Sequence, residues 1–124
     1  MRRETVSSND KINYIEFPSR DLAVTKKFFS KAFGWSFIDF GPDYVAFNNA
    51  GINGGFYKSD KCVSTESGSA LIVLYSSDLE QTMINVENAG GAIAKSIFSF
   101  PGGRRFHFED PNGNEYAVWS DKGI

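Results

Sequence analysis

Short stretches in which apolar and polar residues alternate run along most of the chain, separated by turns rich in Gly, Pro and Asn. Alternation with a period of two is typical of a strand that buries one face. The pattern therefore indicates a protein built largely from sheet. It predicts eight strands, over residues 11–18, 35–40, 44–48, 53–57, 70–75, 92–97, 104–109 and 115–119.

Two stretches, residues 22–33 and 79–88, instead repeat their apolar residues with the longer period of an amphipathic helix. Asp21 precedes the first and Asp78 the second, and a carboxylate at this position accepts hydrogen bonds from the free amide groups of the first turn. A glycine follows each stretch, as is common at the end of a helix. We therefore expect two helices, each capped by an aspartate.

The order strand, helix, three strands occurs twice. Asp21-Leu22 matches Asp78-Leu79, and the same offset lays Gly34 on Gly91. Neither half has enough apolar surface to be stable alone. We therefore expect an α+β protein in which two tandem βαβββ modules form one curved mixed sheet system with a concave cavity.

The domain boundaries follow from the same repeat. Residues 1–10 are polar and are expected to fray. Residues 58–69 are polar without periodicity and are interpreted as a linker. The prediction is a single domain over 11–120, with module one at 11–57, the linker at 58–69 and module two at 70–120.

Composition and charge narrow the functional classes. The 124 residues suit one domain, and a net charge of −2 argues against nucleic acid as a partner. No apolar run is long enough to span a bilayer, and the N-terminus lacks the apolar stretch of a secretory signal. The single cysteine, Cys62, fits a reducing compartment. We predict a cytoplasmic protein with no membrane partner.

The hairpin over residues 100–120 carries the only histidine, His107, close to two arginines and two carboxylates. Alternation predicts which strand residues share the concave face with it, and small residues among them leave room for a ligand. Such a face, aromatic with one charged corner, is typical of a small-molecule site. The candidate ligand-binding residues are Tyr14, Glu16, Tyr44, Tyr57, Tyr75, Arg105, His107, Glu115 and Trp119.

The duplicated βαβββ pattern, with Asp-Leu at the first helix and DPNGN before the last strand, resembles the vicinal oxygen chelate superfamily. This group includes glyoxalase I, extradiol dioxygenases, fosfomycin-resistance enzymes and bleomycin-binding proteins. The resemblance covers about residues 11–120, estimated from motif spacing. The run KINYIEFPSRDL, followed by FFSKAFGWSF, is similar to the glyoxalase-like branch.

The resemblance implies a divalent metal on the concave face, held by residues from the first and last strand of each module. In this chain the four positions fall on Tyr14, Gly55, Leu71 and Ala117. Gly, Leu and Ala side chains offer no donor atom, and a neutral tyrosine is a poor ligand. We therefore expect no bound metal and no other cofactor.

Three functions remain open. The first is a metal-free protein that binds a small aromatic or amphipathic molecule, with any acidic group directed at Arg105 and His107. The second is a lyase or isomerase-type enzyme with Glu16 and His107 as catalytic candidates and Arg105 beside them. The third is an interaction module whose aromatic face forms a homodimer. Alternatively, His107 could hydrogen-bond across the sheet and Arg105 could pair with Glu109 or Glu16, both as purely structural contacts.

Overall fold

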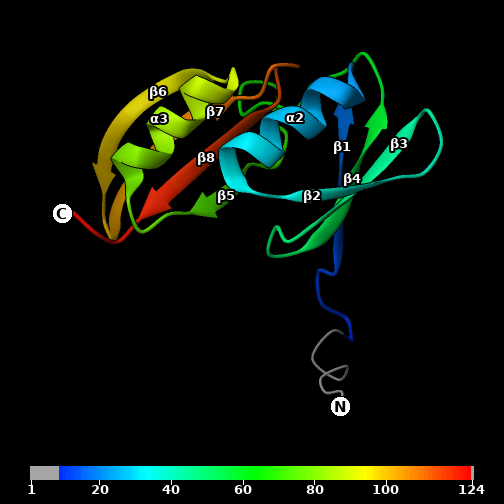
Figure 1. Ribbon diagram of the computed structural model, residues 1–124. Coiled ribbons are helices and arrows are strands. Elements are labelled where there is room, and N and C mark those ends of the chain that lie inside the picture. The colour runs from blue at the N-terminus through cyan, green and yellow to red at the C-terminus, as the bar shows by residue number, and fades with distance from the viewer. Residues whose placement is uncertain (1–8, 124) are drawn as a thin grey trace.

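The computed structural model describes residues 9–123 and contains two four-stranded sheets, each accompanied by one helix (Figure 1). This arrangement confirms the predicted α+β fold of two tandem βαβββ modules. The fraying expected over residues 1–10 falls almost entirely outside the described residues. The elements are β1 (Tyr14–Ser19), α2 (Leu22–Phe33), β2 (Ser36–Asp39), β3 (Tyr44–Asn48), β4 (Asn53–Lys58), β5 (Ile72–Tyr75), α3 (Leu79–Ala89), β6 (Ala92–Phe100), β7 (Gly103–Glu109) and β8 (Glu115–Ser120).

Both sheets have the same strand order, β1-β4-β3-β2 in the first and β5-β8-β7-β6 in the second. In each sheet the first strand of the module pairs in parallel with the last, and the remaining pairs are antiparallel. The sheets are therefore mixed, as predicted. This order also leaves β1 and β5 as edge strands.

The two helices begin where the sequence predicts. Asp21 Oδ1 accepts a hydrogen bond from the backbone N–H of Val24 at 3.2 Å, and Asp78 Oδ1 accepts one from that of Gln81 at 3.2 Å. Each helix ends at a glycine with positive φ, a conformation that glycine adopts without steric cost. Neither helix is long and apolar enough to cross a membrane, which is the finding for the described residues.

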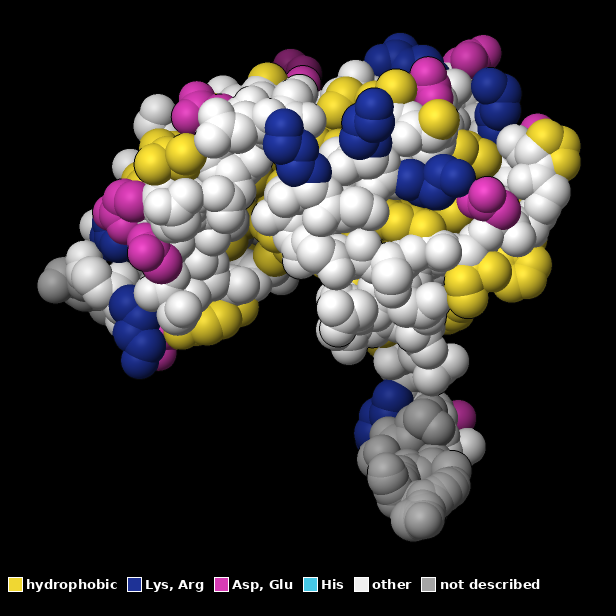
Figure 2. Space-filling view, viewed as in Figure 1, with side chains coloured by type: hydrophobic (Ala, Val, Ile, Leu, Met, Phe, Trp, Pro, Cys, Tyr) yellow, Lys and Arg dark blue, Asp and Glu magenta, His cyan; other side chains and the backbone are white. Residues whose placement is uncertain are grey.

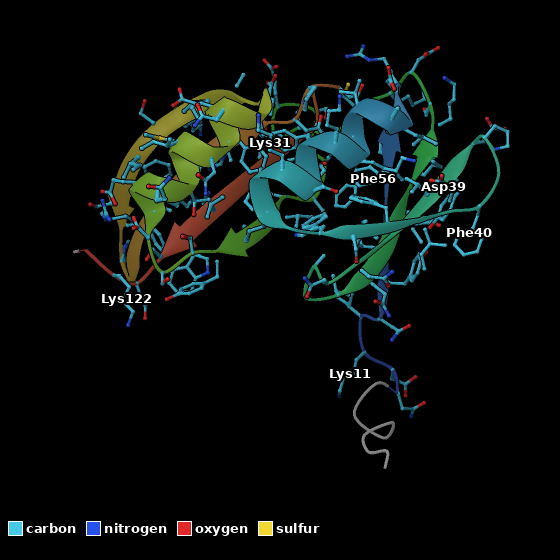
Figure 3. All side chains as sticks on the ribbon, in the orientation of Figure 1. Lys11, Lys31, Asp39, Phe40, Phe56 and Lys122 are labelled. Carbon is cyan, nitrogen blue, oxygen red and sulfur yellow. The ribbon has the colours of Figure 1, made fainter. Side chains whose placement is uncertain are left out.

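One aromatic core joins the modules, and helix α2 lies at its centre. The fully buried ring of Phe29 lies 5.5 Å from that of Phe56 in the first sheet and 5.3 Å from that of Tyr116 in the second, between ring centroids. Phe17 of β1 also contacts Tyr116, at 5.6 Å. Figure 3 labels Phe56 close to α2, while α3 packs beside α2 over the second sheet. The modules therefore share one core, as the repeat predicted.

The turn before β8 fastens the last hairpin to the first module. Asn112 Nδ2 donates to Thr25 Oγ1 at 2.6 Å and to Ser19 Oγ at 3.2 Å. Asn114 Nδ2 donates to the carbonyl of Pro18 at 2.7 Å. Both asparagines are buried, and a buried polar group without a hydrogen bond costs free energy. These hydrogen bonds therefore stabilise the contact between the two modules.

Residues 59–71 contain no helix or strand, yet they are fixed along the start of β8. The backbone N–H of Val63 donates to Asn114 Oδ1 at 2.9 Å, and its carbonyl accepts from the N–H of Glu115 at 2.9 Å. Cys62 Sγ donates to the carbonyl of Asn112 at 3.1 Å. This segment therefore packs against the second module instead of hanging free.

Candidate functional site

Three of the predicted site residues form a directed hydrogen-bond chain on the first sheet. Tyr44 donates to Glu16 Oε2 at 2.9 Å, and the hydroxyl oxygens of Tyr14 and Tyr44 lie 2.6 Å apart. A phenol has one hydrogen, and Tyr44 uses its own on Glu16, so Tyr14 is the donor to Tyr44. We call Tyr14–Tyr44–Glu16 the tyrosine relay. It leaves the Tyr14 oxygen and Glu16 Oε1 able to accept further hydrogen bonds.

A glycine makes the tyrosine relay possible. In the sheet, Gly55 of β4 lies between Glu16 of β1 and Ala46 of β3. A Cβ atom at Gly55 would overlap the Tyr44 hydroxyl and would lie 2.7 Å from the carbonyl of Val45. Because position 55 has no side chain, Tyr44 can cross β4 and reach the residues of β1.

The surroundings also fix the protonation state of Tyr44. Burial raises the pKa of the Tyr44 phenol, and its hydrogen bonds to Tyr14 and Glu16 raise it further. The phenol is therefore protonated at neutral pH. Tyr44 acts in this cluster as a hydrogen-bond donor and not as a base.

A second polar cluster, His107–Glu115–Thr65, lies on the second sheet and is closed. His107 Nδ1 lies 2.8 Å from Glu115 Oε2, while Glu115 Oε1 accepts from the backbone N–H and the hydroxyl of Thr65 at 2.7 and 2.9 Å. His107 is 1% exposed and Glu115 8%. Burial alone would raise the pKa of Glu115, but the hydrogen bonds from His107 and Thr65 outweigh it and lower that pKa. We call this set the sealed cluster.

Arg105 lies beside the sealed cluster but bonds to neither of its expected carboxylate partners. Its guanidinium carbon lies 5.5 Å from the ring centroid of Phe98 and 5.9 Å from that of Phe100, a cation–π arrangement. Within residues 9–123, no ion pair joins Arg105 to Glu16 or Glu109. Of the two residues expected to meet an acidic ligand group, Arg105 alone keeps appreciable exposed surface.

The remaining candidates take part in neither set of hydrogen bonds. Tyr75 donates to Asp121 Oδ1 at 2.6 Å, and its ring lies 5.3 Å from that of Trp119. Tyr57 is exposed on β4, opposite Tyr44. Across residues 9–123, no side-chain hydrogen bond joins the tyrosine relay to the sealed cluster or to the Tyr75–Trp119 pair. The structure therefore divides the predicted face into separate groups.

Two residues that sequence reasoning missed complete these groups. Thr65 lies in the polar segment before β5, where nothing in its neighbourhood marks it as the partner of Glu115. Asp121 directly follows β8, so its closeness to Tyr75 could have been found only from the β5–β8 pairing.

The described chain is thus a tandem βαβββ protein with accessible polar groups on one face of its first sheet. The chain belongs to the Glyoxalase/Bleomycin resistance protein/Dioxygenase superfamily, whose family model matches residues 11–118. No curated protein matches the chain significantly.

Several solved structures share the fold. A glyoxalase-related enzyme from Fulvimarina pelagi is 16% identical with a TM-score of 0.74, over 89% of this chain and 87% of its own. The genomically encoded fosfomycin resistance protein FosX from Listeria monocytogenes is 17% identical with a TM-score of 0.73, over 91% and 93%. TioX from Micromonospora sp. ML1 is 16% identical with a TM-score of 0.68, over 88% and 97%. At these identities the likeness concerns the fold alone.

The residues at the four expected metal positions do not fit a divalent ion. Tyr14 donates its hydroxyl hydrogen to Tyr44, and Tyr44 fills the space in front of Gly55. Leu71 and Ala117 carry no donor atom. In the described part of the chain, no group of three or more His, Cys, Asp or Glu side chains converges as metal ligands would.

Proposed function

We propose that this protein binds a small aromatic or amphipathic molecule without a metal, on the face of the first sheet that carries the tyrosine relay. The relay crossing Gly55 is the observation that carries the proposal. It holds polar groups in fixed directions beside exposed aromatic surface, and such preorganisation lowers the cost of binding. Membership of a superfamily named partly for bleomycin resistance supports a small-molecule ligand.

The free atoms of the tyrosine relay indicate what the ligand must offer. The Tyr14 oxygen and Glu16 Oε1 are both acceptors, so a complementary ligand carries a donor such as an ammonium, hydroxyl or amide N–H group. The rings of Tyr14 and Tyr57, which are 47% and 41% exposed, supply apolar contact and cation–π surface. A cationic or donor-bearing aromatic compound therefore suits this face.

A lyase or isomerase reaction that uses Glu16, Arg105 and His107 together is less well supported. Glu16 lies on β1, whereas Arg105 and His107 lie on β7, which is separated from the β5 edge by β8. Within residues 9–123, no hydrogen bond or ion pair joins Glu16 to Arg105 or His107. His107 is also buried in the sealed cluster.

We also propose that the protein is a homodimer in solution. Apolar side chains lie on the surface beside the β2–β3 hairpin (Figure 2), and others are exposed along β5. Groups of exposed large apolar residues often mark protein–protein interfaces. Ile38, Phe40, Tyr57, Val73 and Tyr75 are between 41% and 60% exposed. Light scattering should give twice the mass of one chain, and the mass of a single chain would contradict the dimer.

The binding proposal is tested by a thermal-shift screen of aromatic amines, alcohols and carboxylates, with and without a chelator. We expect amines or alcohols to stabilise the protein equally in both conditions. Glu16→Gln should weaken the best hit about tenfold or more, because a hydrogen bond to a charged group is lost. Glu87→Gln, the same change at an exposed position on α3, is the matched control. Binding that requires an added metal, or that Glu16→Gln leaves unchanged, would contradict the proposal.

A further inference from the structure

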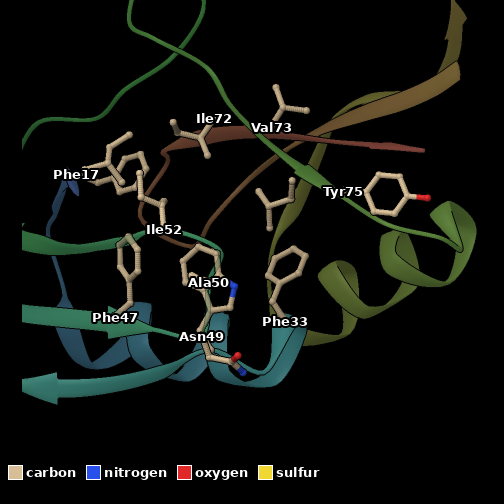
Figure 4. A pocket seen from close by; sticks show the side chains of 12 residues that line it. Phe17, Phe33, Phe47, Asn49, Ala50, Ile52, Ile72, Val73 and Tyr75 are labelled. Carbon is tan, nitrogen blue, oxygen red and sulfur yellow. The ribbon is translucent and has the colours of Figure 1, made fainter. Parts of the chain in front are cut away.

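A cavity of about 360 Å³ lies where the edge strands β1 and β5 diverge (Figure 4). It is on the opposite side of the first sheet from the tyrosine relay, because Ile15 and Phe17 alternate along β1 with Tyr14 and Glu16. Its volume falls in the range of small-molecule sites. The lining residues are Ile15, Phe17, Phe33, Trp35, Phe47, Asn49, Ala50, Ile52, Ile72, Val73, Leu74 and Tyr75.

None of the lining residues is charged, and most are aromatic or aliphatic. In Figure 4, Phe17 and Phe47 lie on one side of the cavity, Phe33 and Tyr75 lie on the other, and Asn49 lies at its margin. A charged molecule would lose its hydration here without gaining a partner. The cavity therefore suits an uncharged, flat molecule that can stack on these rings.

Trp35, one of the lining residues, adds a hydrogen-bond donor without a protein partner to this apolar wall. Its ring is 8% exposed and is held against Phe29 and Phe47, at centroid distances of 4.5 and 4.9 Å. The indole Nε1–H has no hydrogen-bond partner among residues 9–123, and it is not among the polar atoms sealed from solvent there. An indole N–H can only donate, and buried tryptophans usually pair it. A ligand with an acceptor would take the place of solvent as its partner.

We propose that this cavity binds an uncharged aromatic molecule whose carbonyl oxygen accepts a hydrogen bond from Trp35 Nε1. The inference does not depend on the ligand proposed above, since that ligand carries a donor and lies on the other face of β1. The two sites differ in charge as well as in the polarity of their hydrogen bonds.

The indole N–H signal of Trp35 in a nitrogen–proton correlation spectrum reports on binding directly. The chain has two tryptophans, so Trp119→Phe assigns the signal. Acetophenone is the probe, α-methylstyrene is its isostere without the acceptor, and benzoate is its charged analogue. We expect acetophenone to move the Trp35 signal downfield in a saturable way. α-Methylstyrene should bind about fivefold more weakly without that downfield shift, and benzoate should not bind.

Two variants complete the test. Ala50→Phe fills the cavity and should abolish acetophenone binding, whereas Ala94→Phe makes the same change at an exposed position on β6 and should not. Trp35→Phe should bring acetophenone and α-methylstyrene to equal affinity by calorimetry. If Trp35→Phe fails to fold, Ala50→Phe alone decides the result.

The proposal is overturned if no probe binds, if both isosteres move the Trp35 signal alike, or if Ala50→Phe binds acetophenone as well as Ala94→Phe does. It is also overturned if the Trp35 signal moves with protein concentration alone and acetophenone does not compete, because a second copy of the chain would then fill the cavity. None of these outcomes bears on the Glu16→Gln result, so the two proposals fail separately.

Discussion

The tyrosine relay and the sealed cluster use similar groups, a carboxylate held by side-chain hydrogen bonds on a sheet face, and differ in access. Glu16 is exposed and keeps one oxygen free, whereas Glu115 is buried with both oxygens occupied. The linker closes the second cluster through Thr65, and nothing equivalent among residues 9–123 covers the first. Access to solvent therefore separates a candidate site from an internal support, although both resemble sites in the sequence.

Removing the carboxylate of the sealed cluster should cost more stability than disrupting the tyrosine relay. Glu115→Ala leaves the buried His107 Nδ1 without a partner and removes the acceptor of two hydrogen bonds from Thr65, so we expect a loss of about 2–3 kcal/mol in the free energy of unfolding. Urea denaturation measures it. Glu109→Ala, at the exposed carboxylate opposite in the sheet, should change stability by less than about 0.5 kcal/mol. Similar losses in both variants would show that the cluster is not a specific support.

A substitution at Gly55, which takes no part in the hydrogen bonds of the tyrosine relay, should still disrupt the relay. Gly55→Ala places a methyl group against the Tyr44 hydroxyl and the carbonyl of Val45, and such overpacking costs about 1–3 kcal/mol. A double-mutant cycle with Tyr44→Ala separates the two contacts by denaturation. The cost of Gly55→Ala should fall when Tyr44 is absent. An unchanged cost would assign the whole penalty to the backbone.

The two helix caps are a feature that both modules share, so they test whether the modules are also equivalent in energy. Asp21→Ala and Asp78→Ala should each lower the free energy of unfolding by about 1 kcal/mol, since each carboxylate accepts from one amide of the first turn. Denaturant midpoints compare both with Asp60→Ala, an exposed aspartate outside the helices. A large loss for one cap and none for the other would show that the modules are not energetically equivalent.

The smallest expected effect is a change in how stability depends on pH, and we expect it to come from Glu115 of the sealed cluster. The pKa of Glu115 is lowered in the folded protein, so Glu115 contributes stability above its unfolded pKa of about 4.3. That contribution is lost as the pH falls through the lower, folded pKa. Glu115→Gln should therefore flatten the stability profile below about pH 5 relative to wild type. Asp110, whose pKa burial raises, acts in the opposite direction in both proteins. Parallel profiles would contradict the prediction.

Local chemistry made much of the fold predictable. Asp21 and Asp78 act within four residues of themselves, and the alternation of strand residues is a property of each strand alone. The order of these elements then identified the modules. Helix α2 was predicted with its observed ends because a cap, a glycine and an apolar stripe agree there.

The candidate site was less predictable because its contacts depend on distances between strands. Tyr44 reaches Glu16 only because β4 lies between β3 and β1 with Gly55 at the crossing point. Thr65 meets Glu115 across a long separation in sequence. The cavity beside Trp35 depends on how two sheet edges diverge, and alternation within one strand carries no information about that angle.

The bare position at Gly55 constrains how this protein can change over evolutionary time. A mutation that places histidine or glutamate there meets the Tyr44 hydroxyl before it can meet an ion. The side chain of residue 44 must therefore move away or become smaller first, and either change breaks the tyrosine relay. The path to a metal-binding descendant passes through an intermediate with neither the relay nor a complete set of ligands. Selection for the tyrosine relay alone would therefore disfavour the first substitution on the way to a metal site.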